Sequence, residues 1–280
     1  MNTASTVSKR LKANCFTHIQ HRSMAIITLT SDWGTSDYYL AAVKGAIYTQ
    51  LPEAIVVDIS HSIRHFDLEG AAFTIRNCYQ SFPKGTIHII GINSEESMDI
   101  PHIAIEAKGH YFIGADTGIF SMILGDKPDQ SFHLDIPADT GYFTFSTRDR
   151  FVKAAVHIAK GLPINQLGDP CPQLNSKLLF QPTTDNKSIK GLVVYIDAYE
   201  NLITNISEKL FRFEQRGRAF EIAFSIYRLK KIQTSYLDVP VPDVLALFGS
   251  HGFLELAINQ GNAASLLGME RNSPVQVNFL

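Results

Sequence analysis

Short runs of continuous apolar residues alternate along the first half of the chain with segments whose apolar side chains recur at helical spacing. The elements that these patterns predict are, in order, strand 26–29, helix 38–51, strand 54–59, helix 66–79, strand 86–92, strands 103–106 and 111–113, and helix 148–160. Fully apolar strands separated by amphipathic helices are typical of a mostly parallel sheet that is covered on both faces. We therefore predict an N-terminal α/β domain with a mostly parallel central sheet over residues 24–180.

The pattern changes after Pro170. Residues 171–190 are rich in Pro, Asn, Lys and Thr and show no sustained period, which is typical of a linker. The strand-like runs beyond them are 192–196, 219–226, 253–258 and 275–279, and the one short helical pattern is 262–267. Strands without long helices between them predict an antiparallel barrel or sandwich. We therefore predict a smaller C-terminal β-barrel domain over residues 191–280, after a linker at 181–190.

Residues 1–23 have a different character from the rest of the chain. Their basic residues have no acidic partner, Ser and Thr are frequent, and no apolar period is present. A transit peptide has this composition, but a disordered leader, or an upstream start codon ahead of Met24, explains it equally well. We favour a disordered leader, because there is no secretory apolar core and folding signals begin directly after Met24.

Composition narrows the class of protein. With 45% hydrophobic and 19% charged residues over 280 positions, the chain can bury a large core. A net charge of -2 provides no basic field for nucleic acid or anionic membranes, and no apolar run is long enough to span a membrane. Three widely spaced cysteines, Cys15, Cys78 and Cys171, indicate free thiols and a cytoplasmic protein. The ten histidines show no metal-ligand spacing, so we predict no metal.

Candidate chemistry begins where the first strand ends. The run at 26–29 breaks into Asp32, Gly34 and Asp37 before the first helix. A carboxylate at the carboxyl end of a buried strand lies at the sheet edge where open α/β folds bind ligands. Such a carboxylate can accept two hydrogen bonds from a vicinal diol such as a ribose. On spacing alone, both acids are also compatible with turn and N-cap positions, where Asp is common.

Seven segments in order along the chain resemble those of the S-adenosylmethionine hydroxide adenosyltransferase family, whose relatives include fluorinase and chlorinase. They are TSDWGTSDYYLAAVKGAI (30–47), VDISHSI (57–63), FPKGTIHII (82–90), GADTGIFS (114–121), TFSTRDRF (144–151), YIDAYENLITNI (195–206) and LELAINQGNAASLLG (254–268). One such segment would be weak evidence. Seven in order, covering almost everything from Met24 onward, are strong evidence for the family and its fold.

The resemblance implies an N-terminal α/β domain, a C-terminal β-barrel domain, and a homotrimer with ligand sites between neighbouring subunits. It implies a displacement at the ribose 5′ carbon of S-adenosylmethionine, in which methionine leaves and water attacks, or a halide in the relatives. Because sulfonium is already a good leaving group, the protein has to orient the ribose and bring a desolvated nucleophile in line. No cofactor is implied besides this substrate.

The resemblance also assigns roles to acids. Asp32 takes the place of the carboxylate that holds the ribose diol, and Asp37 and Asp197 take the places of acids that hold the methionine ammonium. As an alternative, Asp197 is a turn residue.

Five further residues complete the implied ligand site. Asn201 takes the place of the adenine-reading Asn, and Phe66 and Tyr199 take the places of aromatic faces against the ligand. Ser250 and the backbone near Ala263 complete the methionine and adenine ends. The alternatives are a helix-start contact for Phe66, a turn residue for Asn201 and a loop hydroxyl for Ser250.

The chain departs from the family at the water-activating groups. The family's Asp falls on Asn93, its Arg on Ile100 or Pro101, and its His on Ser146. Asn and Ser can orient water but cannot remove its proton at neutral pH. Thr147 matches a hydroxyl position that lines the halide pocket of the relatives. We therefore predict that Asn93, Ser146 and Thr147 line the nucleophile pocket.

The loop after Asn93 carries acids that bear on the same question. Glu95, Glu96 and Asp99 are candidates for a replacement base, with His102 nearby, although a solvated acidic loop is the favoured interpretation. His61 is expected to be a structural hydrogen-bonding residue rather than a catalyst.

Three functional hypotheses follow. In the first, the protein is an enzyme that hydrolyses S-adenosylmethionine to adenosine and L-methionine. In the second, it is a non-catalytic binder or sensor of S-adenosylmethionine or adenosine. In the third, a halide or another small anion is the nucleophile, for which Thr147 is the positive sign.

Overall fold

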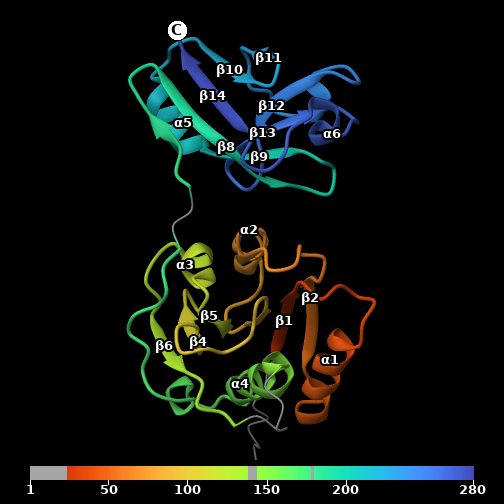
Figure 1. Cartoon of the computed structure of the whole chain (residues 1–280), viewed down its shortest axis with the longest axis vertical. Coiled ribbons are helices and arrows are strands. Elements are labelled where there is room, and N and C mark those ends of the chain that lie inside the picture. Colours follow the sequence, from red (N-terminus) through yellow and green to blue (C-terminus); the bar gives the residue numbers. More distant parts are fainter. Residues whose placement is uncertain (1–23, 138–143, 178–179) are drawn as a thin grey trace, which may run out of the picture.

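The computed structural model describes residues 24–137, 144–177 and 180–280, which form two sheets with separate cores (Figure 1). The predicted leader, Cys15 among it, lies outside the described residues. Cys78 and Cys171 are free thiols.

Sheet A is formed by the first part of the chain. Its strands are β1 (Ile26–Ser31), β2 (Ile55–Ser60), β3 (Ile87–Gly91), β4 (His102–Ala107), β5 (His110–Ala115) and β6 (Gln130–His133). They lie in the order β2-β1-β3-β5-β4-β6, with β2, β1, β3 and β5 parallel and β4 antiparallel to both neighbours. The predicted, mostly parallel sheet is therefore confirmed. The short strand β6 was not predicted, because its sequence QSFH contains no apolar run.

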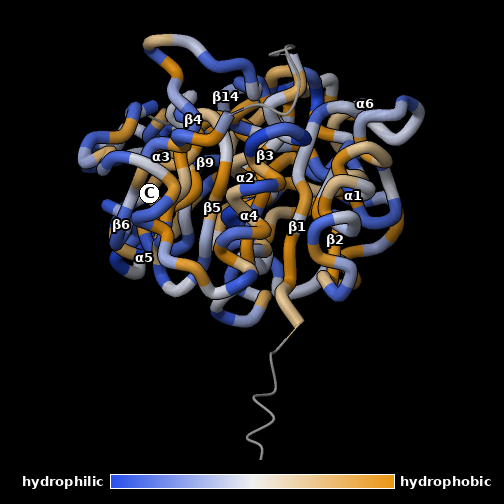
Figure 2. The backbone as a smooth tube through the Cα atoms, turned by 90° about the horizontal axis from the view of Figure 1, so that it is seen from below, coloured by the Kyte–Doolittle hydropathy of each residue, from blue (hydrophilic) through white to orange (hydrophobic). Residues whose placement is uncertain are grey.

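Helices cover both faces of sheet A. The helices are α1 (Tyr39–Gln50), α2 (Leu68–Arg76), α3 (Ile119–Leu124) and α4 (Val152–Ala159), the last preceded by a π-helical turn, η2 (Thr147–Phe151). Neighbouring residues of β3 show the two cores: Ile89 packs with α1 and α4, and Ile90 packs with α2 and α3. Figure 2 shows the apolar central strands β1, β3 and β5 side by side.

Sheet B is formed by the second part of the chain. Its strands are β7 (Thr183–Thr184), β8 (Ser188–Ile196), β9 (Leu202–Ser207), β10 (Phe220–Phe224), β11 (Tyr227–Leu229), β12 (Val244–Phe248), β13 (Phe253–Ile258) and β14 (Pro274–Phe279). All their pairings are antiparallel, in the order β11-β10-β14-β8-β9-β13-β12, with β7 on β8. The Gln233 N–H, just beyond β11, donates to Ala246 O of β12 at 2.8 Å, so the sheet is a nearly closed barrel.

Two further helices belong to sheet B, and one differs from the prediction. The short helix α6 (Ala263–Leu267) lies where the pattern placed one, whereas α5 (Glu208–Gln215) was not predicted. Helix α5 is amphipathic but has only eight residues, mostly charged or polar, and buries only Phe211, so its pattern is short and its apolar content low. Its start does carry a signal, since the Ser207 hydroxyl caps it by accepting from the Leu210 N–H at 3.2 Å. Short 3-10 turns lie at Tyr79–Ser81, Ile164–Gln166 and Tyr236–Asp238.

Side chains of helix α2, which packs on sheet A, also contact sheet B. Arg271, before β14, forms ion pairs with Asp67 and Glu69 at the start of α2. On the same helix, the Phe73 ring stacks on Tyr195 of β8 at 4.4 Å between ring centroids. The predicted linker at 181–190 includes β7 and the first residues of β8, which place this segment against the barrel.

Candidate functional site

Asp32 lies directly after β1, at the carboxyl edge of sheet A. Its side chain is only 6% exposed, and its Oδ2 accepts a hydrogen bond from the Phe66 N–H at 2.8 Å. Its Oδ1 accepts no hydrogen bond from the described residues. Phe66 has a positive φ of 61° and therefore lies outside α2, so the predicted helix start at residue 66 was two residues early. The carboxylate and the loop that it fixes face the edge where parallel sheets bind ligands.

Trp33, Gly91 and Thr147 meet beside this carboxylate. A Cβ on Gly91, the last residue of β3, would lie 2.8 Å from Cη2 of Trp33 and 3.3 Å from Oγ1 of Thr147. Only a residue without a side chain allows this approach. Thr147 is fully buried, and its hydroxyl donates to Ser94 Oγ at 3.3 Å. The structure therefore brings Thr147 and the loop after β3 to the edge that carries Asp32.

Asn93 lies at the start of that loop with a positive φ of 46°, a conformation that Asn adopts more readily than most residues. Ser146, the residue before Thr147, is buried. The three residues predicted to line a nucleophile pocket thus follow β3 or begin the π-helical turn η2, and none of their side chains carries a charge.

The loop between β8 and β9 holds a second group of predicted residues. Asp197 accepts hydrogen bonds from the backbone N–H groups of Tyr199 and Asn201, at 2.9 and 2.8 Å, and from the Asn201 side chain at 3.0 Å. Asp197 therefore organises the turn, as the alternative interpretation expected, with most of its acceptor capacity used inside the loop. The Asn201 amide nitrogen donates one of its two hydrogens to Asp197, so its second hydrogen and its amide oxygen are the groups left to donate to and accept from a ligand.

Glu200 joins this loop to α6. It has a positive φ of 64°, and its carboxylate accepts from the Asn262 side chain at 2.9 Å and from the Ser265 N–H at 3.0 Å. These contacts hold Ala263, which is fully buried, at the start of α6 beside the loop. Sequence reasoning missed Glu200, although it lies within the YIDAYENLITNI segment.

Ser250 is exposed in the turn between β12 and β13, next to a polar cluster. Buried Glu255 accepts from the Tyr236 hydroxyl at 2.6 Å and lies 3.2 Å from His251 Nε2. Burial, together with the Glu255 hydrogen bond, raises the pKa of Tyr236. The Tyr236 phenol therefore stays protonated and is a permanent donor to Glu255.

The remaining predicted residues lie on the surface. Asp37 is exposed before α1, and Phe66 and Tyr199 are 72% and 77% exposed. No hydrogen bond or ion pair in the described part of the chain joins the group at sheet A to the group at sheet B. Within the described part of one chain, the predicted residues therefore lie in two separate groups.

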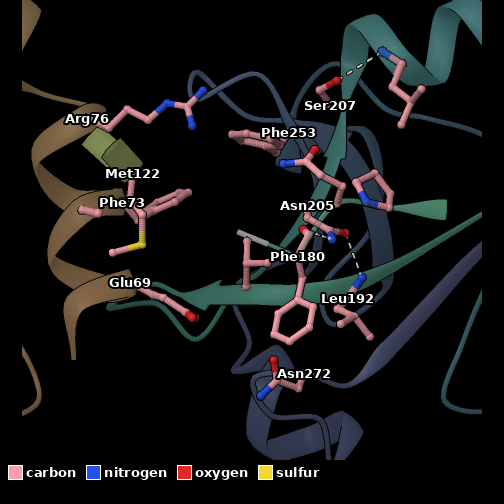
Figure 3. A pocket seen from close by; sticks show the side chains of 15 residues that line it. Glu69, Phe73, Arg76, Met122, Phe180, Leu192, Asn205, Ser207, Phe253 and Asn272 are labelled. Carbon is pink, nitrogen blue, oxygen red and sulfur yellow. Dashed lines mark hydrogen bonds between the residues drawn. The ribbon is translucent and has the colours of Figure 1, made fainter. Parts of the chain in front are cut away.

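A pocket between the two sheets lies apart from both groups of predicted site residues. It has a volume of about 390 Å³ and is lined by apolar side chains of α2 and β8 and by the polar Asn205 and Ser207 of β9, with Arg76 and Glu69 on the α2 side (Figure 3). None of the predicted site residues lines it.

The acidic loop after Asn93 is organised by ion pairing. Glu96 pairs with Arg150 of η2 and lies 3.9 Å from His102 Nδ1. Glu95, Glu96 and Asp99 are all exposed, as predicted for a solvated loop, and Glu96 is in addition tied to the fold through Arg150. His61 is buried, with its Nδ1 2.6 Å from Ser31 Oγ and its Nε2 3.2 Å from Asp58, which confirms its structural role.

Two other kinds of feature are absent from the described residues. Among them, no group of three or more His, Cys, Asp or Glu side chains is placed to hold a metal ion. No helix in that same part of the chain is long and apolar enough to cross a membrane.

Sequence comparison identifies the parent family. The description "SAM hydroxide adenosyltransferase N-terminal domain" matches residues 27–168, and the corresponding C-terminal domain matches residues 191–276. The (R)-S-adenosyl-L-methionine hydrolase of Thermus thermophilus is 29% identical over 266 residues, which cover 91% of this chain and 100% of that protein. The fluorinase of an Actinoplanes species is 23% identical over 84% of this chain and 91% of that protein.

Solved structures show the same fold. A conserved hypothetical protein from Thermus thermophilus superposes with a TM-score of 0.72 at 28% identity, over 92% of this chain and 100% of that one. An uncharacterized conserved protein from Thermotoga maritima superposes with a TM-score of 0.81 at 23% identity, over 90% and 99% of the two chains. Since both family descriptions match in order over most of its length, this chain belongs to the SAM hydroxide adenosyltransferase family.

Proposed function

We propose that this protein binds S-adenosylmethionine and hydrolyses it at the ribose 5′ carbon to adenosine and L-methionine. Relatives named (R)-S-adenosyl-L-methionine hydrolase are 26% to 29% identical to it over about 90% of its length. The observation that carries the proposal is Asp32, a buried carboxylate at the sheet edge with one oxygen held by Phe66 N–H and the other open to a ligand. Those two oxygens suit the two hydroxyls of a ribose.

The reaction requires little from the protein beyond alignment. A water oxygen forms a bond to C5′ while the C5′–S bond breaks. The electron pair of the C5′–S bond goes to sulfur, which becomes the thioether of methionine. The extra proton of the attacking water passes to solvent, since Asn93, Ser146 and Thr147 cannot take it at neutral pH. The proposed role of these three residues is to orient the water, which accelerates the reaction by fixing the geometry of attack.

The complete site is proposed to lie between subunits of a homotrimer. An N-terminal α/β domain (24–180) would supply Asp32 and the nucleophile pocket, and the C-terminal barrel domain (191–280) of a neighbour would supply Asn201 and Tyr199. This arrangement accounts for two half-sites that are not joined within one chain, and for the exposure of Phe66 and Tyr199, which are 72% and 77% exposed. Each exposed ring would be covered by the ligand or by the neighbour.

Asp32→Asn tests the proposed substrate contact. The amide oxygen of Asn can still accept from Phe66 N–H, so the loop is retained while the charge is lost. We expect the purified protein to convert S-adenosylmethionine to adenosine and methionine, and the variant to bind the substrate about tenfold to a hundredfold more weakly. Chromatography of the products and calorimetry measure both quantities. Absence of adenosine above background from the wild-type protein would refute the hydrolase proposal.

A second candidate function is binding without turnover. It is favoured by the neutral residues Asn93 and Ser146, which stand where the family has its water-activating Asp and His. Saturable binding without products, in fluoride, chloride or halide-free buffer, would support it. Ser146→Ala separates the two candidates further: for an enzyme it lowers turnover while the dissociation constant stays unchanged.

A further inference from the structure

His102 is buried beneath the loop that follows β3. Its ring is 1% exposed, its Nε2 lies 3.0 Å from the Ser94 carbonyl oxygen, and its Nδ1 lies 3.4 Å from Arg150 Nη1. A carbonyl only accepts, so Nε2 carries the hydrogen, and Nδ1 is then the acceptor for Arg150. Glu96 of the same loop pairs with the Arg150 guanidinium. Arg150 therefore fixes the tautomer of His102 while Glu96 fixes Arg150.

The ring is kept neutral by its surroundings. Burial lowers the pKa of His102 and outweighs the opposing effects of Glu96 and the Ser94 carbonyl, and Arg150 lowers it further. A neutral ring with the hydrogen on Nε2 suits the hydrogen-bond partners on both sides.

Ser94 is held at two points by this arrangement. Its carbonyl accepts from His102, and its hydroxyl accepts from buried Thr147 at 3.3 Å. Asn93, the preceding residue, has a positive φ, so its position depends on how firmly the loop is fixed. Arg150 and Thr147 belong to the same π-helical turn, η2, so the turn contacts the loop at Ser94 and again at Glu96.

We propose that His102, oriented by Arg150 and Glu96, is a positioning residue that holds Ser94 and Asn93 against Thr147 and thereby fixes the nucleophile-side wall of the active site. This inference rests on the proposed hydrolase function. Positioning by His102 provides the fixed geometry that a pocket of neutral residues needs. Without a general base, such a pocket can accelerate the reaction only by orienting the attacking water.

His102→Leu and His102→Gln test the proposal. Leu removes the donor with little change in volume, whereas the Gln amide nitrogen can reach the place of Nε2 and donate to Ser94 O. We expect His102→Leu to lower kcat about tenfold to a hundredfold with KM within about twofold, and His102→Gln to recover most of the loss. His157→Leu is the matched control, because it removes a comparable bond to Pro163 O (2.8 Å) on the far part of α4, and should leave kcat unchanged.

Three outcomes would overturn the proposal: an unchanged kcat in His102→Leu, a rise in KM that matches the fall in kcat, or a Gln variant no better than the Leu variant. If His102→Leu does not fold, Arg150→Met carries the same test, since the Arg150 side chain is 16% exposed. Hydrogen–deuterium exchange at residues 93–99 separates this inference from the hydrolase proposal. If the wild-type protein makes no adenosine, the hydrolase proposal fails, and exchange that is no faster in His102→Leu refutes the positioning role independently.

Discussion

At the scale of single residues, two unusual positions support the candidate site. Phe66 has a positive φ, which is strained for a bulky side chain, and the Asp32 carboxylate holds its N–H in place. Gly91 is required for space rather than for backbone conformation, because Trp33 and Thr147 occupy the volume that a side chain would need. Small changes at these positions should therefore have effects larger than their size suggests.

Gly91→Ala should destabilise the protein and impair the site together. The added methyl group would displace Trp33 or Thr147, and overpacking of this kind costs about 1 to 3 kcal/mol of unfolding free energy. Denaturant unfolding and the adenosine assay measure the two effects. Gly45→Ala in α1 is the control: nothing lies within 4 Å of its new Cβ, so it should stabilise the protein by about 0.5 to 1 kcal/mol. Wild-type stability in Gly91→Ala would contradict the packing described.

At the scale of elements, the N-terminus of α2 connects the two sheets. Asp67 caps the helix by accepting from Gly70 N–H at 3.0 Å, and it also pairs with Arg271 of the barrel. Burial alone would raise the pKa of Asp67, but the hydrogen bonds from Arg271 and Gly70 outweigh burial and lower it. One carboxylate thus stabilises the helix and the contact between the sheets.

Arg271→Met should lower the unfolding free energy by about 1 to 2 kcal/mol at pH 7, a modest value because the pair is only partly buried. The pKa of Asp67 is lower in the folded protein than its ordinary value of 3.8, so the pair stabilises the fold above about pH 4. The stabilisation is lost as the pH falls below that value, and the difference between variant and wild type should shrink there. Arg228→Met, which breaks an exposed pair with Glu221, should change stability by less than about 0.5 kcal/mol. A difference that stays undiminished from pH 7 down to pH 2 would exclude Asp67 as the source.

At the scale of the whole molecule, the proposed assembly starts from two separate groups of predicted site residues, which it would join into one site. Sheets A and B have separate cores and meet through α2, while Asp32 and Asn201 lie on elements that have no polar contact with each other among the described residues. Asp32 and Asn201 are each only 6% exposed in the single subunit, but the rings of Phe66 and Tyr199 beside them are left in water. Closing the two groups against a neighbour would explain why large aromatic side chains remain on the surface.

Mixed oligomers test this arrangement directly. At a substrate concentration well below the wild-type dissociation constant, Asp32→Asn and Asn201→Ala should each retain at most about a tenth of the activity, but in an equal mixture of co-expressed subunits about a quarter of the interfaces join two intact half-sites. Activity should therefore recover to about a quarter of the wild-type value. Asp32→Asn mixed with Ser146→Ala is the control, since both changes fall on the same half-site and no interface is restored. Recovery in the control mixture, or none in the test mixture, would argue against sites between subunits.

The local pattern of the sequence determined the parts of this protein that depend on near neighbours. Apolar runs and helical spacing predicted the central strands of sheet A and the covering helices α1, α2 and α4, because continuous burial leaves a direct mark on composition. The apolar helix α3 and the strands β9 and β12 were not predicted. The short polar strand β6 and the charged helix α5 were missed, because few of their side chains reach a core. The ordered motifs placed Asp32, Asn93 and Thr147 at the ends of elements, which is where loops carry chemistry.

Tertiary structure alone decided which of those residues meet. Trp33, Gly91 and Thr147 are far apart in the chain, and nothing in their spacing indicates that one glycine lets all three come together. The loop acids were expected to be solvated and are exposed, but sequence did not show that Glu96 also pairs with Arg150 and lies close to buried His102, because η2 packs against the end of β3. Sequence determines which groups a chain carries and which local elements they sit on. Which of these groups touch, and in which protonation state, depends on long-range packing and on the burial that it produces.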